Sequence, residues 1–583
     1  MKVRTTIFVL LFAMLSFSMP VFAVENLFQG THRLNSFAAG MIKPGMRAKR
    51  TLKPSEIKQT GESETFYTFN FSTNKWENTD ATLMLISSNL YVYLESSRDF
   101  DRAMMQRFVD EFENRIYPKT TRYFGSEARP GIDNDNHITI LLMDIKDEFD
   151  KTGTYTSGYF NRGDCYRPDE IPEGVNLKSN QREMLYVDIS PADIESDELF
   201  ATIAHELQHL IHFYHDVDEY DWLNESCSQI CTYLCGYGHP RQLQAYLKNP
   251  DNSLLAWAPW NQVANYGQVY LWSYYLMIRF CNTDEERVAF FQNLVKDPQN
   301  GMLSFNIQLK QFDADFSSVF SDFCIAGFLN RPGLLPQAYS FGSELPEFQL
   351  PATAFADRLP TMYRNSVSLW GADLIKAAVA PGEIEVGFAG DLTNLPNSFT
   401  VALVFFNETD SRVEKTEFIE NIKSTTDRVR VMLPGDNDGF PPPPPVKTQM
   451  GSISTFVPDR CNMLYLVIMG KGPADLEDSM LAWSGKANYR VDIKATPKST
   501  TDFSSINSAI LLRNYAALTG ESHTDSDFLQ SLADEIFLML KAESELADRP
   551  LAEKILAEDD FAGLHKLVND FGKFSELHSK FKF

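Results

Sequence analysis

The sequence predicts a multidomain α+β protein, in which an α+β lobe is followed by a β-sandwich-like module and a helical C-terminal tail. Three observations predict this fold class. The chain has 583 residues, which is too long for a single core. Residues 63–345 combine strand and helix patterns, residues 350–497 show mainly the period-two alternation of strands, and residues 503–583 return to helical spacing. Hydrophobic residues (44%) and charged residues (22%) occur at ordinary globular frequencies, so the bulk of the chain should fold.

The first 23 residues have the pattern of a signal peptide. Lys2 and Arg4 precede an apolar run over residues 7–17, and residues 21–23 (VFA) end in the small-x-small pattern that signal peptidase recognises. No later stretch approaches the roughly 20 apolar residues of a transmembrane helix. We therefore expect an exported protein, periplasmic or extracellular, without a transmembrane segment.

Residues 24–62 are expected to be a linker or a short propeptide. They are polar, they are interrupted by Pro44 and Pro54, and residues 47–50 (RAKR) form a basic cluster that resembles a processing site. The segment therefore lies outside the predicted lobe.

Strand and helix patterns alternate along residues 63–345. Alternation predicts strands at 65–71 and over 81–95, the latter as a hairpin, and helical spacing covers 101–124. Apolar runs at 138–143 and 184–189 predict buried strands, and a long helix follows around residue 205. This order is typical of an α+β lobe. Residues 133–137 (DNDNH) lack the glycine and glutamate of a calcium loop, so we expect a polar turn there.

The segment 350–497 is expected to be an all-β module. Period-two patterns occur at 383–388, 400–406, 428–432 and 463–469. Five prolines at 441–445 interrupt them and favour an exposed loop, because proline cannot donate to a sheet ladder.

Charge and cysteine content exclude some functions. The formal net charge is −25 and no basic patch occurs, so the chain has no electrostatic footprint for nucleic acid. The seven cysteines are an odd number, so at least one is free or pairs between chains. Cys227, Cys231 and Cys235 recur every four residues, which places them on one helical stripe, where core packing is expected.

Residues 201–210 (ATIAHELQHL) carry His-Glu-x-x-His at 205–209. Four residues of α-helix return to within about 40° of the same face and advance about 6 Å, which lets His205 and His209 reach one tetrahedral zinc ion. Glu206 projects beside that face, where its carboxylate can take a proton from a metal-bound water. An apolar strand before the helix and an exported chain fit this interpretation. The pattern predicts a zinc hydrolase with Glu206 as general base.

Three residues compete to be the third ligand. His212 lies about 10 Å along the helix from His205, too far to share an ion. His215 completes the metzincin spacing, but His212 stands where metzincins have the glycine that turns the chain back. Glu225 follows His209 by sixteen residues, within WLNES, and a second helix packed against the first would bring it to the metal. Glu225 is favoured, His215 remains the alternative, and a surface glutamate at a helix start is a further interpretation.

Several motifs together resemble the hyicolysin family of zinc metallopeptidases, peptidase family M30. They are HELQHLIHF, WLNES, TFYTFNFSTNKWENTDATL, FENRIYPKTTRYFG and GIDNDNHITILLMDI, and they span about residues 64–290. The resemblance implies a zincin-like lobe of gluzincin type, with His205, His209 and Glu225 as zinc ligands and Glu206 as the catalytic residue. Ser226 departs from the glycine expected after the ligand glutamate, which concerns local packing more than ligation.

A second, looser resemblance concerns an oxyanion donor. Residues 266–270 (YGQVY) are similar to the helix start of gluzincin aminopeptidases, whose tyrosine hydrogen-bonds the oxyanion. By that analogy Tyr266 is the candidate donor and Tyr270 the second choice. A purely structural aromatic residue is the alternative, because Tyr274 and Tyr275 lie nearby in the sequence.

The sequence thus predicts a secreted zinc-dependent metalloendopeptidase with a protein or peptide substrate and no cofactor besides Zn²⁺. The β module and the helical tail would position substrate or attach the enzyme to a cell-surface or extracellular-matrix target. Two alternatives remain: a non-catalytic adhesin or binding protein on a zincin scaffold, and a metzincin-type protease that uses His215.

Overall fold

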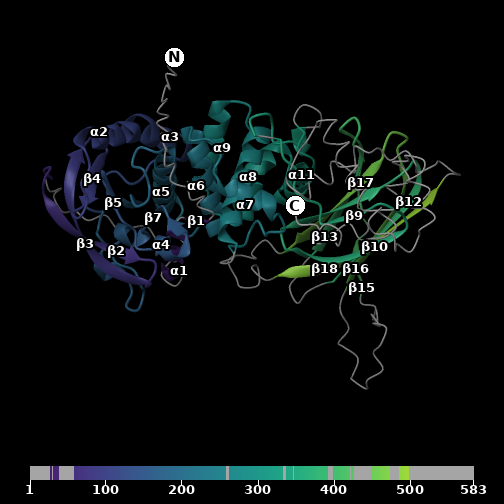
Figure 1. Ribbon diagram of the computed structural model, residues 1–583, viewed down its shortest axis with the longest axis horizontal. Helices are drawn as coiled ribbons and strands as arrows, with labels where there is room; N and C mark the ends of the chain where they lie inside the picture. The colour runs from purple at the N-terminus through teal and green to yellow at the C-terminus, as the bar shows by residue number, and fades with distance from the viewer. Residues whose placement is uncertain are drawn as a thin grey trace, which may run out of the picture. The chain divides into compact units, whose positions relative to one another are not determined.

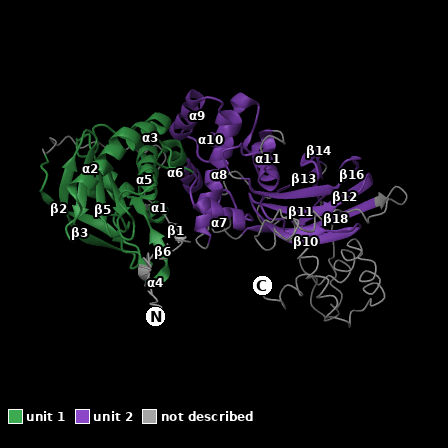
Figure 2. Ribbon diagram, turned by 45° about the horizontal axis from the view of Figure 1, so that its top comes forward, with its two compact units in different colours: residues 1–218, 231–238 green, residues 219–230, 239–583 purple. Residues whose placement is uncertain are grey.

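The computed structural model describes residues 26–28, 30–38, 58–257, 261–331, 337–345, 347–391, 398–420, 422–425, 448–472 and 485–497. The predicted signal peptide, the basic cluster 47–50, the strand at 428–432, the proline run and the helical tail lie outside these residues. Among the described helices, none has the length and apolar character needed to cross a membrane. The chain forms two compact units: unit 1 is 1–218 with 231–238, and unit 2 is 219–230 with 239–583 (Figure 2). The domain boundaries drawn from the sequence stay predictions.

Unit 1 is built on a six-stranded mixed sheet with the strand order β2-β3-β4-β5-β8-β7 (Figure 1). The three strands β4, β5 and β8 run parallel, and the two edges are antiparallel to their neighbours. The predicted hairpin over 81–95 is confirmed as β3 and β4. The strands are β2 (Ser63–Asn70), β3 (Lys75–Ile86), β4 (Leu90–Glu95), β5 (Ile138–Met143), β7 (Gly158–Phe160) and β8 (Met184–Asp188).

The helical pattern over 101–124 is confirmed, with an interruption. The structure has α2 (Arg102–Glu111), a π-helical turn over Phe112–Ile116 and α3 (Tyr117–Phe124). Pro118 stands at the start of α3, where a missing backbone N–H is tolerated. The polar turn at 133–137 is also confirmed, because the backbone N–H groups of Asp135 and His137 donate to carboxylates within the turn.

A short N-terminal stretch belongs to unit 1. Strand β1 (Asn26–Phe28) pairs in parallel with β6 (Thr154–Thr156), and helix α1 (Thr31–Ala38) follows it. Helix α4 (Phe149–Thr152) precedes β6. Leu34 of α1 is fully buried in the same hydrophobic cluster as aromatic residues of the sheet. Part of the expected linker is therefore packed into the unit.

Helix α5 (Asp197–His215) begins where the sequence provides a cap. The Ser196 side chain accepts a hydrogen bond from the Leu199 N–H, and Asp197 and Glu198 lie in the first turn, where negative charge favours the helix dipole. Nearly all of its residues from Leu199 to Phe213 are buried. The helix expected around residue 205 is therefore confirmed as a core helix of unit 1.

The helices that follow belong to unit 2, apart from the end of α6. They are α6 (Asp221–Cys235), α7 (Gln242–Lys248), α8 (Gln262–Phe280), α9 (Asp284–Lys296), α10 (Met302–Leu309) and α11 (Phe316–Leu329). Helix α6 is continuous although its last residues are counted with unit 1. The cysteine stripe on α6 is buried, and no disulfide joins any of the seven cysteines, all of which lie among the described residues. Core packing is thereby confirmed for this stripe.

The predicted all-β module is a pair of five-stranded sheets. One has the order β14-β13-β17-β11-β9 and the other β10-β18-β12-β16-β15. The strands are β9 (Ala354–Ala356), β10 (Thr361–Ser368), β11 (Ala372–Ala378), β12 (Gly382–Asp391), β13 (Ser398–Asn407), β14 (Arg412–Phe418), β15 (Lys423–Thr425), β16 (Thr448–Val457), β17 (Met463–Lys471) and β18 (Lys486–Pro497).

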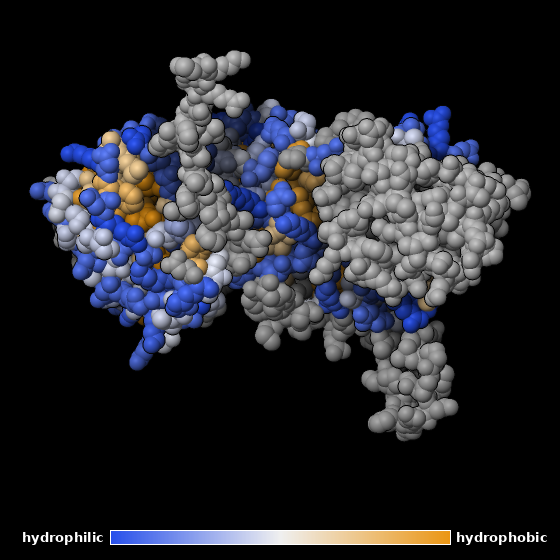
Figure 3. Space-filling model, in the orientation of Figure 1, coloured by the Kyte–Doolittle hydropathy of each residue, from blue (hydrophilic) through white to orange (hydrophobic). Residues whose placement is uncertain are grey.

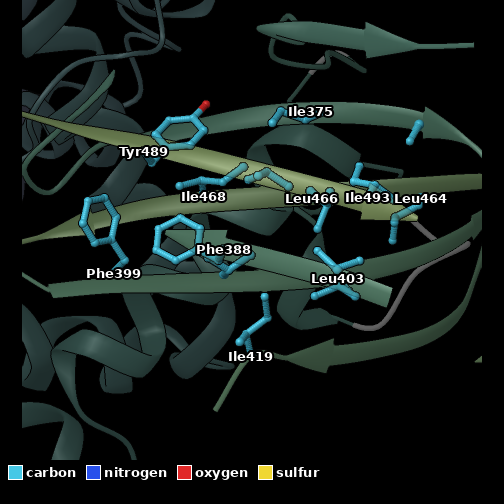
Figure 4. Packing of buried hydrophobic residues seen from close by; sticks show 14 of the residues in the cluster. Ile375, Phe388, Phe399, Leu403, Ile419, Leu464, Leu466, Ile468, Tyr489 and Ile493 are labelled. Atoms are coloured by element: carbon cyan, nitrogen blue, oxygen red, sulfur yellow. The ribbon is translucent and has the colours of Figure 1, made fainter. Parts of the chain in front are cut away.

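The two sheets share one hydrophobic core, which is the arrangement of a β-sandwich. Figure 4 shows Leu403 and Leu466 from the first sheet beside Phe388 and Ile493 from the second, and all four are buried. Strand β12 alternates buried and exposed residues as its sequence predicts. On the face shown in Figure 3, hydrophilic side chains cover most of the described surface and hydrophobic ones form smaller patches.

Candidate metal centre

The two histidines of the motif face each other on α5. Their Nε2 atoms are 3.0 Å apart and their rings are nearly perpendicular, at an interplanar angle of 80°. His205 is fully buried and His209 is 1% exposed. As the sequence predicts, the helical spacing brings one nitrogen of each imidazole close to the other.

Glu225 on α6 joins the two histidines. One ligand atom from each of the three side chains lies within 4.8 Å of the others, and Glu225 is 1% exposed. Ligand atoms at 2.0–2.1 Å from a tetrahedral ion lie roughly 3.3 Å apart, close to the separation of the two nitrogens. Two imidazoles and one carboxylate form the donor set of a His₂Glu zinc site, which leaves a fourth position open. The residues present fit a zinc ion.

The competing histidines lie elsewhere. His212 is buried beside Gln208, whose Nε2 is 3.4 Å from His212 Nδ1, and burial lowers the pKa of His212 to about 3. His215 is exposed at the last residue of α5, which runs on without the turn that a metzincin needs. Its ring lies against Gly125, where an added Cβ would be 2.8 Å from His215 Nε2. Among the described residues, the group that can hold a metal contains neither histidine.

Glu206, the expected general base, is fully buried one residue after His205. Its Oε2 accepts a hydrogen bond of 2.6 Å from the Thr31 hydroxyl. Strand β7 lies directly over the same part of α5, because a Cβ added to Gly158 would be 2.7 Å from Thr202 Cγ2 and 3.5 Å from Glu206 Cγ. Only a glycine allows the edge of the sheet to lie this close to the helix.

Ser226, which departs from the expected glycine, has a clear packing role within unit 2. Its hydroxyl donates to the Val269 carbonyl at 3.0 Å and lies 2.5 Å from the Ser273 hydroxyl, both on α8. Hydrogen bonds between buried polar groups fix the helices that carry them. Ser226 thus ties α6 to α8 one residue after Glu225.

Both candidate tyrosines lie on α8 and are buried. The Tyr266 ring packs edge-on against Trp257, with 4.7 Å between ring centroids. The Tyr270 hydroxyl is 2.5 Å from His239 Nδ1. The role of Tyr266 as an oxyanion donor stays a prediction.

Three residues near Glu206 belong to none of the motifs that predict the site: Thr31, Gly158 and Phe160. Thr31 is 175 residues from Glu206 in the chain, and no periodic pattern links them. The Phe160 backbone N–H donates to the Thr31 hydroxyl at 2.7 Å. A glycine within the short run TYTSGYF was the available signal, because an isolated glycine in a strand indicates a close backbone approach.

Known proteins similar to this chain are consistent with the metal centre. The neutral metalloprotease ShpI of Staphylococcus hyicus is 28% identical over 273 residues, which cover 44% of this chain and 59% of that protein. The chain resembles the hyicolysin family. This similarity confirms the resemblance predicted from the motifs around residues 64–290, and the hyicolysin-like region spans less than two thirds of the curated relative. No family model matches the chain.

Two solved structures align with a quarter of the chain. They are the pre-peptidase C-terminal domain of a collagenase from Bacillus anthracis and the surface-associated copper-binding protein CorA of Methylomicrobium album BG8. Each covers 25% of this chain and nearly all of its own, with 12% and 10% identity. Both TM-scores are 0.15, so neither bears on the fold or the function.

Proposed function

We propose that this protein is a zinc-dependent metalloendopeptidase whose metal is held by His205, His209 and Glu225. The observation that carries the proposal is the meeting of these three buried side chains within 4.8 Å, with Glu206 next to the first of them on α5. The similarity to a neutral metalloprotease supports the reaction class. The lobe around the site is proposed to be zincin-like, of gluzincin type.

The chain's own residues have separate roles in this proposal. A zinc ion held by His205, His209 and Glu225 would polarise the scissile carbonyl and lower the pKa of a bound water to about 7. Glu206 accepts the proton of the attacking water and passes it to the leaving amine. Tyr266 is the proposed hydrogen-bond donor to the oxyanion, with Tyr270 second. A base is not needed where zinc is only structural, so Glu206 supports catalysis over a purely binding role.

The proposal also covers the export of the protein and its partners. We propose that residues 1–23 direct the chain to the periplasm or the extracellular space, where it cleaves protein or peptide substrates. The sandwich and the C-terminal region would hold a substrate, a cell surface or extracellular matrix.

The test is cleavage of an unstructured protein such as casein by the purified chain with zinc, with and without chelator. Glu206→Gln should keep one zinc per chain and lower kcat by roughly 10²–10⁴, because it removes the general base and leaves the ligands. Tyr266→Phe should lower kcat with little change in KM if its hydroxyl acts only in the transition state. Equal cleavage by the wild type and Glu206→Gln would refute the mechanism. Bound zinc without cleavage, both by the full chain and by a chain cut after Arg50, would favour a non-catalytic binding protein.

A further inference from the structure

The N-terminal segment 26–38 lies along β6 and then reaches β7, the strand that flanks the candidate catalytic residue. Strand β1 pairs in parallel with β6 in the register Asn26 to Thr154 and Phe28 to Thr156. Figure 2 labels the two strands next to each other. The Gly30 N–H then donates to the Gly158 carbonyl at 2.8 Å. Extended peptides bind sheet edges through such main-chain hydrogen bonds. The chain's own N-terminal segment thus occupies an edge on which a peptide could bind.

Directly after its extended part, the segment contacts the Glu206 side chain through Thr31. The Thr31 hydroxyl donates to Glu206 Oε2 at 2.6 Å and accepts from the Phe160 N–H at 2.7 Å. A hydrogen bond of this length to a carboxylate is of the strong, charge-assisted kind. Thr31 is 1% exposed and Glu206 is fully buried, so water does not compete for the contact. The Thr31 hydroxyl therefore lies directly against this oxygen of Glu206 and occupies the place that an attacking water or a substrate would need.

Contacts on both sides of Thr31 hold the segment in this position. A Cβ added to Gly30 would be 2.5 Å from Phe71 Cζ and 3.0 Å from Tyr159 Cβ, so the backbone fits closely there. On the other side, the Asn35 side chain accepts a hydrogen bond of 2.8 Å from Arg162 Nε, and both residues are buried. The contact with Glu206 is therefore part of a fitted interface.

We propose that residues 26–38 are an intramolecular inhibitor, which blocks Glu206 through Thr31 until the chain is cut between residues 38 and 58. This inference rests on the proposed peptidase activity. The sequence between these positions contains Arg47, Lys49 and Arg50, after which a trypsin-like protease hydrolyses a peptide bond. Before the cut, the tether gives the segment a high effective concentration at the site; after the cut, the segment dissociates on dilution.

The test compares the uncut full chain with two variants that weaken the segment differently. Gly30→Val places a side chain against Phe71 and Tyr159 and should expel the segment, whereas Thr31→Val keeps the side-chain shape and removes only the hydroxyl. Ser36→Ala is the matched control, because Ser36 is exposed and, among the described residues, its hydroxyl donates to the Arg33 carbonyl of its own helix. We expect at least tenfold faster peptide cleavage by Gly30→Val, a smaller increase for Thr31→Val and none for Ser36→Ala.

A binding measurement gives a readout that does not depend on activity. A fluorescent peptide with the sequence of residues 24–38 is titrated into each chain after chelation of metal and again with zinc, and anisotropy is recorded. Gly30→Val should bind the peptide at least tenfold more tightly than the wild type, whose site is occupied by its own segment. Replacing the threonine in the peptide with valine should weaken that binding.

The outcomes separate the two proposals. Cleavage by the uncut wild type as fast as by Gly30→Val, with no difference in peptide binding, would overturn the inference and leave the peptidase standing. A fall in activity in Thr31→Val would also overturn it, because Thr31 would then assist Glu206. Tighter peptide binding to Gly30→Val with no cleavage by any chain would refute the peptidase while supporting occupation of the site. In a separate arm, brief trypsin treatment should activate the wild type but not a chain with R47Q, K49Q and R50Q.

Discussion

Gly158→Ala tests whether the close approach of β7 to α5 holds the candidate site together. The added methyl carbon would lie 2.7 Å from Thr202 Cγ2 and 2.9 Å from the Tyr186 carbonyl oxygen, whereas unstrained carbon contacts are about 3.5–4.0 Å. The strand must therefore move away from the helix by about 1 Å. Overpacking of this kind costs about 1–3 kcal/mol.

That cost predicts two measurable effects. For a unit of 150–250 residues, 1 kcal/mol shifts the unfolding temperature by roughly 2–4 °C, so we expect unit 1 to melt about 2–12 °C lower. A displacement of 1 Å at the proposed catalytic group can reduce the rate by about 10²-fold, so kcat/KM of the Gly158→Ala chain cut after Arg50 should be one to two orders of magnitude below that of the wild type cut in the same way. The assays are differential scanning calorimetry and steady-state peptide hydrolysis.

The matched control is Gly387→Ala in β12. A Cβ there meets only ordinary contacts of 3.8 and 3.9 Å with Asp492, so stability and activity should not fall. Thr202→Ser removes the methyl carbon that lies closest to the added Cβ. Combined with Gly158→Ala, it should therefore restore part of the lost stability and activity, because substitutions at contacting residues are not additive. A Gly158→Ala chain with wild-type melting and wild-type kcat/KM would refute the close approach.

Two further predictions concern the ligands and the pH dependence of stability. Mutating residues that only support the ligands typically weakens metal binding about 10- to 100-fold, so Glu225→Ala, which removes a ligand, should weaken zinc binding by more than that. His215→Ala should keep its full zinc content, as measured by elemental analysis. Full zinc retention by Glu225→Ala would refute the ligand set. Burial raises the pKa of Asp164 to about 7, so the folded chain keeps this proton up to about pH 7, whereas the unfolded chain loses it near pH 4. The free energy of unfolding should therefore fall as pH rises through this window, by up to about 4 kcal/mol. Urea denaturation at pH 5 and pH 8 should show a smaller fall for Asp164→Asn, and equal falls in both chains would contradict the argument.

Local patterns predicted the elements of this fold well. The buried run at 138–143 is β5 to the residue, and the long helix expected around residue 205 corresponds to α5. These predictions succeed because helix and strand periods depend on neighbouring residues. The pairing of strands does not depend on neighbouring residues, so local patterns could not predict it. Strand β10 pairs with β18, more than 100 residues later, and β9 lies parallel to β11. Such partners are chosen by burial across the whole unit.

The candidate ligands were predictable for a related reason. His205 and His209 share a helix, so helix geometry alone relates them. Glu225 needed the further assumption that a second helix packs against the first, and the resemblance to known metallopeptidases favoured it. Thr31 and Gly158 were not predictable, because a single hydroxyl and a missing Cβ leave no repeat in the sequence. Their positions follow from packing between distant segments.

Glu206 lies beside an edge strand that a substrate peptide could pair with, and the chain's own segment pairs with the same edge. The Gly158 carbonyl oxygen lies at the edge of the sheet, near Glu206, the proposed base, and accepts a hydrogen bond from the Gly30 N–H. A substrate peptide that used this carbonyl would have to displace Gly30, since one edge cannot pair with two strands at the same place. Inhibition and substrate binding are then competitive, and a change that moves β7 away from α5 weakens both. Gly158→Ala should therefore lower the affinity for the free 24–38 peptide together with kcat/KM, whereas loss of the Thr31 hydroxyl should affect the inhibitor alone.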